Sequence, residues 1–125
     1  MIDEVIKKLE HRKIRFENIN FLAGDASPRK YYSILQGQEN NVLMLDNDLG
    51  NIDNYIYFTK KLQDHVSVPR IINNLRDSGI LILENFSPNK FSELLSNSNR
   101  NDLYKNAIDA LIYIHKNDLK IKLNS

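Results

Sequence analysis

The stretch FLAGDASPRKYYSI, residues 21–34, places a short polar turn between two segments with the side-chain pattern of β-strands. Gly24 can adopt a positive φ, and the residues after it are of types that favour turns. Apolar and polar residues alternate in 14–22, before the turn, and residues 29–35 follow it as a returning strand. These segments therefore predict an antiparallel hairpin closed by a turn over 24–27.

Beyond the hairpin, a polar turn over 37–41 leads into a third strand, residues 42–45. A helix capped by Asn51 is expected to run to about Asp64, because apolar residues recur there at helical spacing. Its predicted inner face consists of Ile52, Tyr55, Ile56, Thr59 and Leu62. Residues 68–72 are expected to form a short strand that begins near Pro69.

A polar turn over 73–78 precedes residues 80–83, four consecutive apolar residues that predict a strand covered on both faces. At the other end of the chain, residues 2–12 have the periodicity of an amphipathic helix. The sequence therefore predicts an α+β fold: an N-terminal helix, a five-stranded antiparallel sheet, one packed helix and two C-terminal helices over 88–95 and 102–115. The last of these has a wide apolar face that requires a partner.

The composition excludes several classes of protein. The 125 residues form one domain with 17 basic and 16 acidic side chains, a net charge of +1 that does not favour a nucleic-acid binder. There are no cysteines, so neither disulfides nor a thiol nucleophile are available. No apolar run approaches the roughly 20 residues that cross a bilayer, and the N-terminus does not have the pattern of a signal peptide. We therefore expect a cytoplasmic protein without a membrane segment.

Two segments could bind a nucleotide. Gly24 permits close approach of the backbone, Ser27 offers a hydroxyl and an N–H, and Arg29 and Lys30 follow, so the turn could bind phosphate. An ordinary hairpin turn explains the same residues. Glu84 and Asn85 follow a buried strand, where backbone groups could pair with a purine edge; the alternative is a core strand that runs into a surface loop.

The chain resembles a bacterial branch of the aminoglycoside phosphotransferase-like kinases, which includes the anomeric kinases of N-acetylmuramate and N-acetylglucosamine. The segment LAGDAS (22–27) with RKYY (29–32) resembles the signature LAGDAS-x-RRY of that branch. VLMLD (42–46) is similar to its VLMD segment, Val68-Pro69 to its Val-Pro segment, and GILILE (79–84) to its hinge strand. The segment LYKNAIDAL (103–111) resembles the first helix of its large lobe.

The resemblance implies a nucleotide-binding small lobe and hinge in residues 1–86 and the start of a large lobe in 87–125. Its phosphate-covering loop would be Gly24, Asp25, Ala26 and Ser27, and its hinge Glu84, Asn85 and Phe86. Arg29 could contact phosphate, or lie on a solvated strand face. The complete enzyme would use ATP and Mg²⁺ to phosphorylate a small molecule, for which an amino sugar is expected.

The chain also departs from the family pattern. Pro28 replaces an aromatic residue, and Met44 or Leu45 lies at the level where kinases carry the phosphate-binding Lys. Asp53 is one candidate for a substitute acidic partner. The catalytic Asp and Asn and the metal-binding Asp are not found in the sequence, so we expect no transfer activity from the chain alone, as in a truncated or split kinase. The alternatives are a non-catalytic binding or regulatory module that docks or self-associates through its C-terminal helix, and a fragment without function.

Overall fold

A computed structural model describes residues 2–24, 29–65, 67–85, 93 and 96 of the chain. The elements in order are α1 (Ile2–His11), β1 (Asn18–Ala23), β2 (Arg29–Gln36), β3 (Glu39–Asp46), α2 (Leu49–Leu62), β4 (Ile71–Leu75), the 3-10 turn η1 (Arg76–Ser78) and β5 (Ile80–Leu83). The predicted α+β fold, with an N-terminal helix, a five-stranded antiparallel sheet and a packed helix, is confirmed. The two predicted C-terminal helices and the domain boundary at 86 lie outside the described residues.

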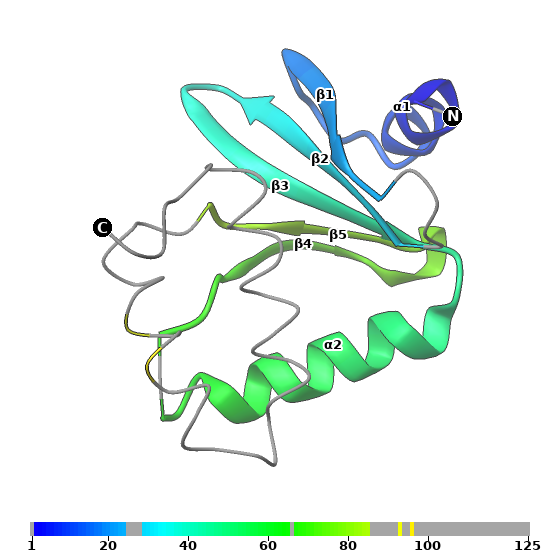
Figure 1. The fold of residues 1–125 in the computed structure, drawn as a ribbon. Helices are drawn as coiled ribbons and strands as arrows, with labels where there is room; N and C mark the ends of the chain where they lie inside the picture. Colours follow the sequence, from blue (N-terminus) through cyan, green and yellow to red (C-terminus); the bar gives the residue numbers. More distant parts are fainter. Residues whose placement is uncertain (1, 25–28, 66, 86–92, 94–95, 97–125) are drawn as a thin grey trace.

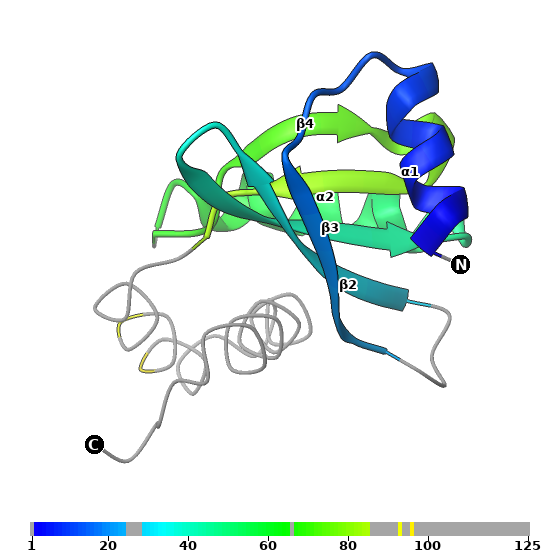
Figure 2. The same cartoon turned by 90° about the horizontal axis from the view of Figure 1, so that it is seen from above.

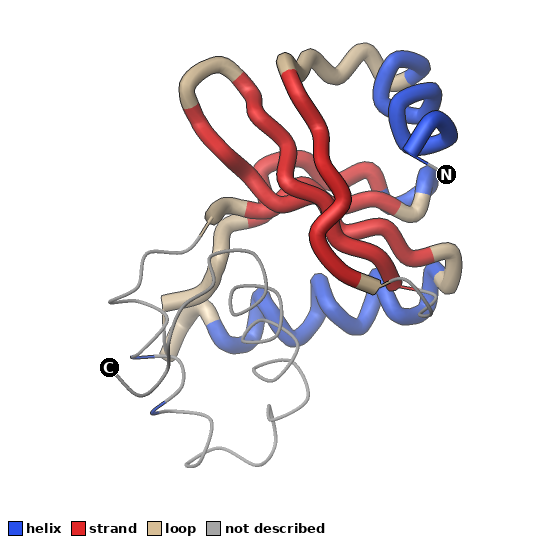
Figure 3. The backbone as a smooth tube through the Cα atoms, turned by 45° about the horizontal axis from the view of Figure 1, so that its top comes forward, coloured by secondary structure: helices blue, strands red, loops and turns tan. Residues whose placement is uncertain are grey.

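The five strands form one sheet in the order β1-β2-β3-β5-β4, and all neighbours are antiparallel. Strand β3 is therefore central, between β2 and β5. Its register pairs Asp46 with Arg29 at one end, and Val42 with Leu83 of β5 towards the other. The β2–β3 turn lies at the far end of the sheet from the connection between β3 and α2 (Figure 3).

The two helices cover opposite faces of this sheet (Figures 1 and 2). Helix α1 packs through Val5 and Leu9 on a cluster that includes Tyr32, Ile34, Leu43, Ile80 and Ile82. Helix α2 packs on the face formed by Tyr31, Val42, Met44, Leu81 and Leu83. Residues 80–83 are buried at every position, as expected for a strand covered on both faces. Tyr31 and Tyr32, neighbours in β2, point to different faces because side chains alternate along a strand.

Several boundaries differ from the sequence predictions. Strand β1 begins at Asn18 rather than near residue 14, and β3 already begins at Glu39, so the turn predicted over 37–41 is shorter. Asp48, not Asn51, caps α2: its carboxylate accepts a hydrogen bond from the backbone N–H of Gly50. The predicted inner face of α2 is correct, with Ile52, Tyr55, Thr59 and Leu62 buried and Ile56 half-buried.

Strand β4 was also misplaced, because residues 73–75, predicted as a turn, belong to it. The 3-10 turn η1 and Gly79 join β4 to β5 so tightly that Leu75 pairs with Ile80. The strand therefore extends to Leu75, and Asn73 and Asn74 tolerate strand geometry because β4 is at the edge of the sheet.

Candidate functional site

The Gly24 turn packs directly on the next strand. Gly24 has φ of 105°, and a Cβ atom built there would lie 2.3 Å from the carbonyl oxygen of Arg29 and 3.0 Å from the Cα of Lys30. Both the conformation and the contact require glycine. Gly24 thus brings the start of the turn against the first residues of β2. The other predicted loop residues, Asp25, Ala26 and Ser27, lie outside the described residues.

Asp46 holds Arg29 at this end of the sheet. The Nε of Arg29 donates to Oδ2 of Asp46 at 3.2 Å, and the Nδ2 of Asn51 on α2 donates to the same oxygen at 3.1 Å. The backbone N–H of Asp48 donates to Oδ1 at 2.9 Å. The Asp46 carboxylate is completely buried, whereas 23% of the Arg29 side chain is exposed. A buried carboxylate with three donors is fully paired and fixes the guanidinium from one side.

The charge of Arg29 is maintained in this environment. Burial by itself would lower the pKa of Arg29, but the neighbouring Tyr31 and the Asp46 carboxylate outweigh it, and the pKa is raised. Arg29 is therefore a permanent cation on the α2 face of the sheet, next to the Gly24 turn.

Helix α2 presents a polar stripe to the same face. Asn51, Tyr55 and Thr59 are four residues apart and so lie one above the other on the helix. The hydroxyls of Tyr55 and Thr59 are buried and have no hydrogen-bond partner among the described residues. Burial is the main cause of a raised Tyr55 pKa; Tyr31 raises it further, whereas Arg29 and Thr59 act in the opposite direction. Thr59 is thus close to Tyr55, although the two hydroxyls do not meet with the geometry of a hydrogen bond.

Met44 lies between these polar groups and the rest of the sheet. It precedes Asp46 by two residues on β3, so both side chains point to the α2 face. Met44 is completely buried and packs in the cluster with Tyr31, Leu81 and Ile52. It contributes apolar surface, not a charge, to this face of the sheet.

The predicted hinge residues lie towards the other end of β3. The backbone N–H of Glu84 donates to the carbonyl of Arg70 at 2.8 Å, and the Glu84 carboxylate accepts from the Arg70 N–H at 3.1 Å. Glu84 thus continues the pairing of β5 with the segment before β4 through its own N–H and its carboxylate. The amide oxygen of Asn85 is buried without a hydrogen-bond partner among the described residues. Phe86 lies outside them.

The predicted site residues are therefore arranged along one strand rather than gathered at one point. Arg29 and the Gly24 turn lie near Asp46, and Glu84 follows Leu83, the partner of Val42. The four-residue step from Val42 to Asp46 spans about 13 Å at the rise of a β-strand. This is the scale of an elongated ligand, not of a compact one.

Asp53, the candidate acidic partner, belongs to a different interaction. Its two carboxylate oxygens accept from Nε and Nη2 of Arg76, each at 2.9 Å, on the exposed side of α2. The partner of Arg29 is Asp46, which sequence reasoning had not selected. One signal was available: Asp46 follows the apolar run VLML directly, and its spacing of two from Met44 assigns it to the same sheet face.

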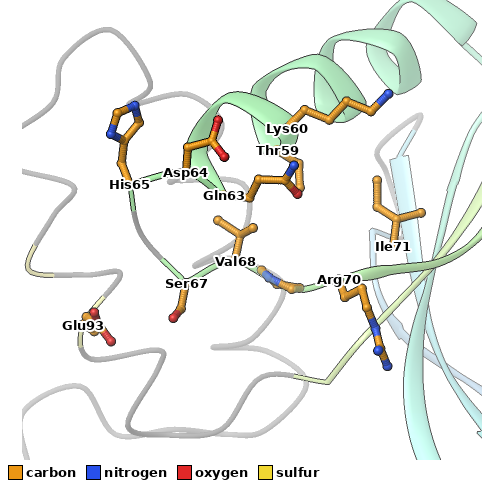
Figure 4. Close-up of a pocket in the computed structure, with 11 residues that line it drawn as sticks. Thr59, Lys60, Gln63, Asp64, His65, Ser67, Val68, Arg70, Ile71 and Glu93 are labelled. Carbon is orange, nitrogen blue, oxygen red and sulfur yellow. The ribbon is translucent and has the colours of Figure 1, made fainter.

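A pocket of about 640 Å³ lies at the carboxyl end of α2, and Arg70, the hydrogen-bond partner of Glu84, is one of the residues that line it (Figure 4). Thr59 and Lys60 line it from the last turns of the helix, and Gln63, Asp64 and His65 from the turn that follows. Val68 lines it from the segment before β4, and Glu93 from across the opening. Because α2 has 14 residues, this pocket is about 20 Å from Asp46 and the amino end of the helix. It is therefore separate from the Gly24 turn and Arg29.

In the part of the chain that the structure describes, no three His, Asp or Glu side chains are grouped so that they could hold a metal ion. No described helix is long and apolar enough to span a membrane. Comparison with known proteins adds no assignment: no family model, no curated protein and no solved structure matches the chain significantly.

Proposed function

We propose that this chain is the ATP-binding small lobe of a small-molecule phosphotransferase of the aminoglycoside phosphotransferase-like kind. The observation that carries the proposal is the strand order of the sheet. Strand β3 lies between β2, which follows the Gly24 turn, and β5, which leads into Glu84. The two segments that the sequence marks for phosphate and purine thus border the same central strand.

The nucleotide would extend parallel to β3, from the Glu84 end of the sheet to the Gly24 end. Its purine would pair with the backbone of 84–86, to which Glu84 contributes its carbonyl, and its triphosphate would extend towards the Gly24 turn and Arg29. The step of about 13 Å between Val42 and Asp46 suits such an extended ligand. Phosphate contact by turn N–H groups and a cation is the usual solution for a triphosphate.

Mg²⁺ would accompany the nucleotide, coordinated by the triphosphate oxygens. The described residues supply no cluster of carboxylates for it, and the sequence lacks the catalytic Asp and Asn and the metal Asp of phosphoryl transfer. What we propose for this chain is therefore nucleotide binding. Transfer to a small hydroxylated acceptor, for which an amino sugar is the first candidate, would require those residues from another lobe.

Thermal unfolding of the full chain with and without Mg-ATP tests the proposal. At an ATP concentration of about a hundred times Kd, binding adds roughly 2.7 kcal/mol to the free energy of unfolding. Mg²⁺ alone is the control for metal effects, and tripolyphosphate is the control for general anion binding. An equal shift with tripolyphosphate and none with adenosine would reject a nucleotide site, as would the absence of any shift at millimolar Mg-ATP.

A further inference from the structure

We propose that Arg29 on β2 is the cation that binds the phosphates of the nucleotide, and that Asp46 on β3 and Asn51 on α2 are the residues that position it. This inference rests on the proposed nucleotide function. It assigns to a β2–β3 ion pair the role that other kinases give to a β3 lysine and a helix glutamate. Asp46 and Asn51 would not touch the nucleotide themselves.

The first argument is the choice of cation. Strand β3 reads ENNVLMLD and contains no basic residue, so a cation on the α2 face near the Gly24 turn has to come from another strand. Lys30 points to the opposite face, where it borders a small cavity with Val5 and Tyr32 beneath α1. Arg29 is on the α2 face, and Gly24 packs against its carbonyl.

The second argument is the environment of Asp46. The Asp46 carboxylate is completely buried although Asp46 is the last residue of β3. Burial of a carboxylate costs free energy of folding unless the charge is paired. Asp46 accepts from the Arg29 Nε, the Asn51 amide and the Asp48 N–H, so its pairing unites β2, β3 and the start of α2. Anchoring at Nε limits rotation of the guanidinium, while 23% of the side chain keeps contact with solvent. A cation held in this way loses little entropy when phosphate arrives.

The experiment is calorimetric titration of the full chain with adenosine, Mg-ADP and Mg-ATP. The variants are Arg29→Met, Asp46→Asn and Asn51→Ala, with Arg76→Met as matched control, since Arg76 pairs with Asp53 and not with Asp46. In Arg29→Met the Kd of Mg-ATP should rise about tenfold or more, the effect of losing a charge-assisted hydrogen bond. In Asp46→Asn it should rise less, up to about tenfold, because only the orientation of Arg29 is lost. The Kd of adenosine should stay within about twofold of that of the unmodified protein in every variant.

The ratio of the two Kd values separates positioning from structural support, because a general disturbance of the fold weakens adenosine and ATP together. An unmodified chain that binds neither adenosine nor Mg-ATP would overturn the proposed function and this inference with it. Unchanged Mg-ATP affinity in Arg29→Met would overturn this inference alone. Equal losses for adenosine and ATP in Asp46→Asn would reduce Asp46 to a structural role.

Asp46→Asn could fail to fold, which circular dichroism would show. Asn51→Ala and Arg29→Lys then decide the question. Asn51→Ala removes one of the three donors to Asp46 and should weaken Mg-ATP selectively. Arg29→Lys retains the charge without the Nε donor, so it should recover only part of the ATP affinity lost in Arg29→Met. Full recovery by Lys would show that orientation by Asp46 is irrelevant.

Discussion

Arg29 and Asp46 lie opposite each other on neighbouring antiparallel strands, and their side chains meet at 3.2 Å on the sheet face that α2 covers. The Asp46 carboxylate also accepts from Asn51 and from the Asp48 N–H. This one buried group therefore joins the hairpin that carries the Gly24 turn to the first turn of α2. Its contribution to stability can be separated from its proposed role in binding.

Asp46→Asn should destabilise the chain substantially in the absence of any ligand. Removing one partner of a fully buried ion pair costs about 3–5 kcal/mol; because Arg29 keeps 23% exposure, we expect roughly 2–3 kcal/mol here. Urea unfolding followed by circular dichroism measures the loss. Asp53→Asn is the control, since it removes a carboxylate from an exposed Arg pair and should cost much less. Similar losses for both variants would contradict the burial argument.

Gly24→Ala should be more harmful than the same change at Gly37. Both glycines have positive φ, 105° and 67°, but a Cβ atom at Gly37 meets nothing within 4 Å, whereas at Gly24 it meets the Arg29 carbonyl. Gly37→Ala should therefore cost about 1 kcal/mol from backbone strain alone, and Gly24→Ala more than about 2 kcal/mol. Urea midpoints compare the two variants, and an equal loss would mean that the turn relaxes away from β2.

The ion pair formed by Asp53 and Arg76 should stabilise the fold at neutral pH and lose this effect in acid. The hydrogen bond and charge of Arg76 lower the pKa of Asp53 below its ordinary 3.8. The unfolded chain therefore takes up this proton first as pH falls, so the stabilisation is complete above pH 3.8 and lost through the lowered pKa below it. Melting temperatures of the unmodified chain and Asp53→Asn should differ at neutral pH and converge as the pH falls through the lowered pKa of Asp53. A constant difference would contradict this linkage.

The sequence predicted the elements of this fold because their patterns are local. Residues 80–83 are uniformly apolar and became β5 with those bounds, and the four-residue spacing of Tyr55 and Thr59 identified the inner face of α2. Errors arose where tertiary pairing decides. Asn73 and Asn74 have turn propensity, but the tight connection through Gly79 pairs them with β5. Asn51 is a good capping residue, but Asp46 engages its side chain and Asp48 caps the helix.

The candidate site was less predictable than the fold. Gly24, Arg29 and Glu84 could be selected from local sequence, but the partner of Arg29 could not, since Asp46 and Asp53 are both acidic residues at plausible distances along the chain. Strand register decides between them: Arg29 faces Asp46 across the sheet, whereas Asp53 faces outward to Arg76. The buried hydroxyls of Tyr55 and Thr59 could not be predicted either. A tyrosine or threonine on the inner face of a helix predicts core packing, but it does not show whether the hydroxyl has a hydrogen-bond partner.

Tyr55→Phe should stabilise the chain and make it less sensitive to alkali. Within the part of the chain that the structure describes, the Tyr55 hydroxyl is buried without a hydrogen-bond partner. An unsatisfied buried hydroxyl costs about 1–3 kcal/mol, so its removal should raise the free energy of unfolding by roughly 1 kcal/mol. Burial also raises the pKa of Tyr55 well above its ordinary 10.0. The unfolded chain thus loses this proton near pH 10.0 while the folded chain keeps it, and stability present below that pH falls as pH rises through it.

Urea unfolding at about pH 7 and about pH 11 measures both effects. The loss of stability between the two pH values should be smaller in Tyr55→Phe than in the unmodified chain. Tyr57→Phe is the matched control on the same helix, because Tyr57 is 55% exposed. Removal of its hydroxyl should change neither the free energy of unfolding at neutral pH nor the loss of stability between the two pH values. A decrease in stability on Tyr55→Phe would show that the hydroxyl is hydrogen-bonded in solution. In that case the polar stripe from Asn51 to Thr59 would be a satisfied network that ties α2 to the sheet.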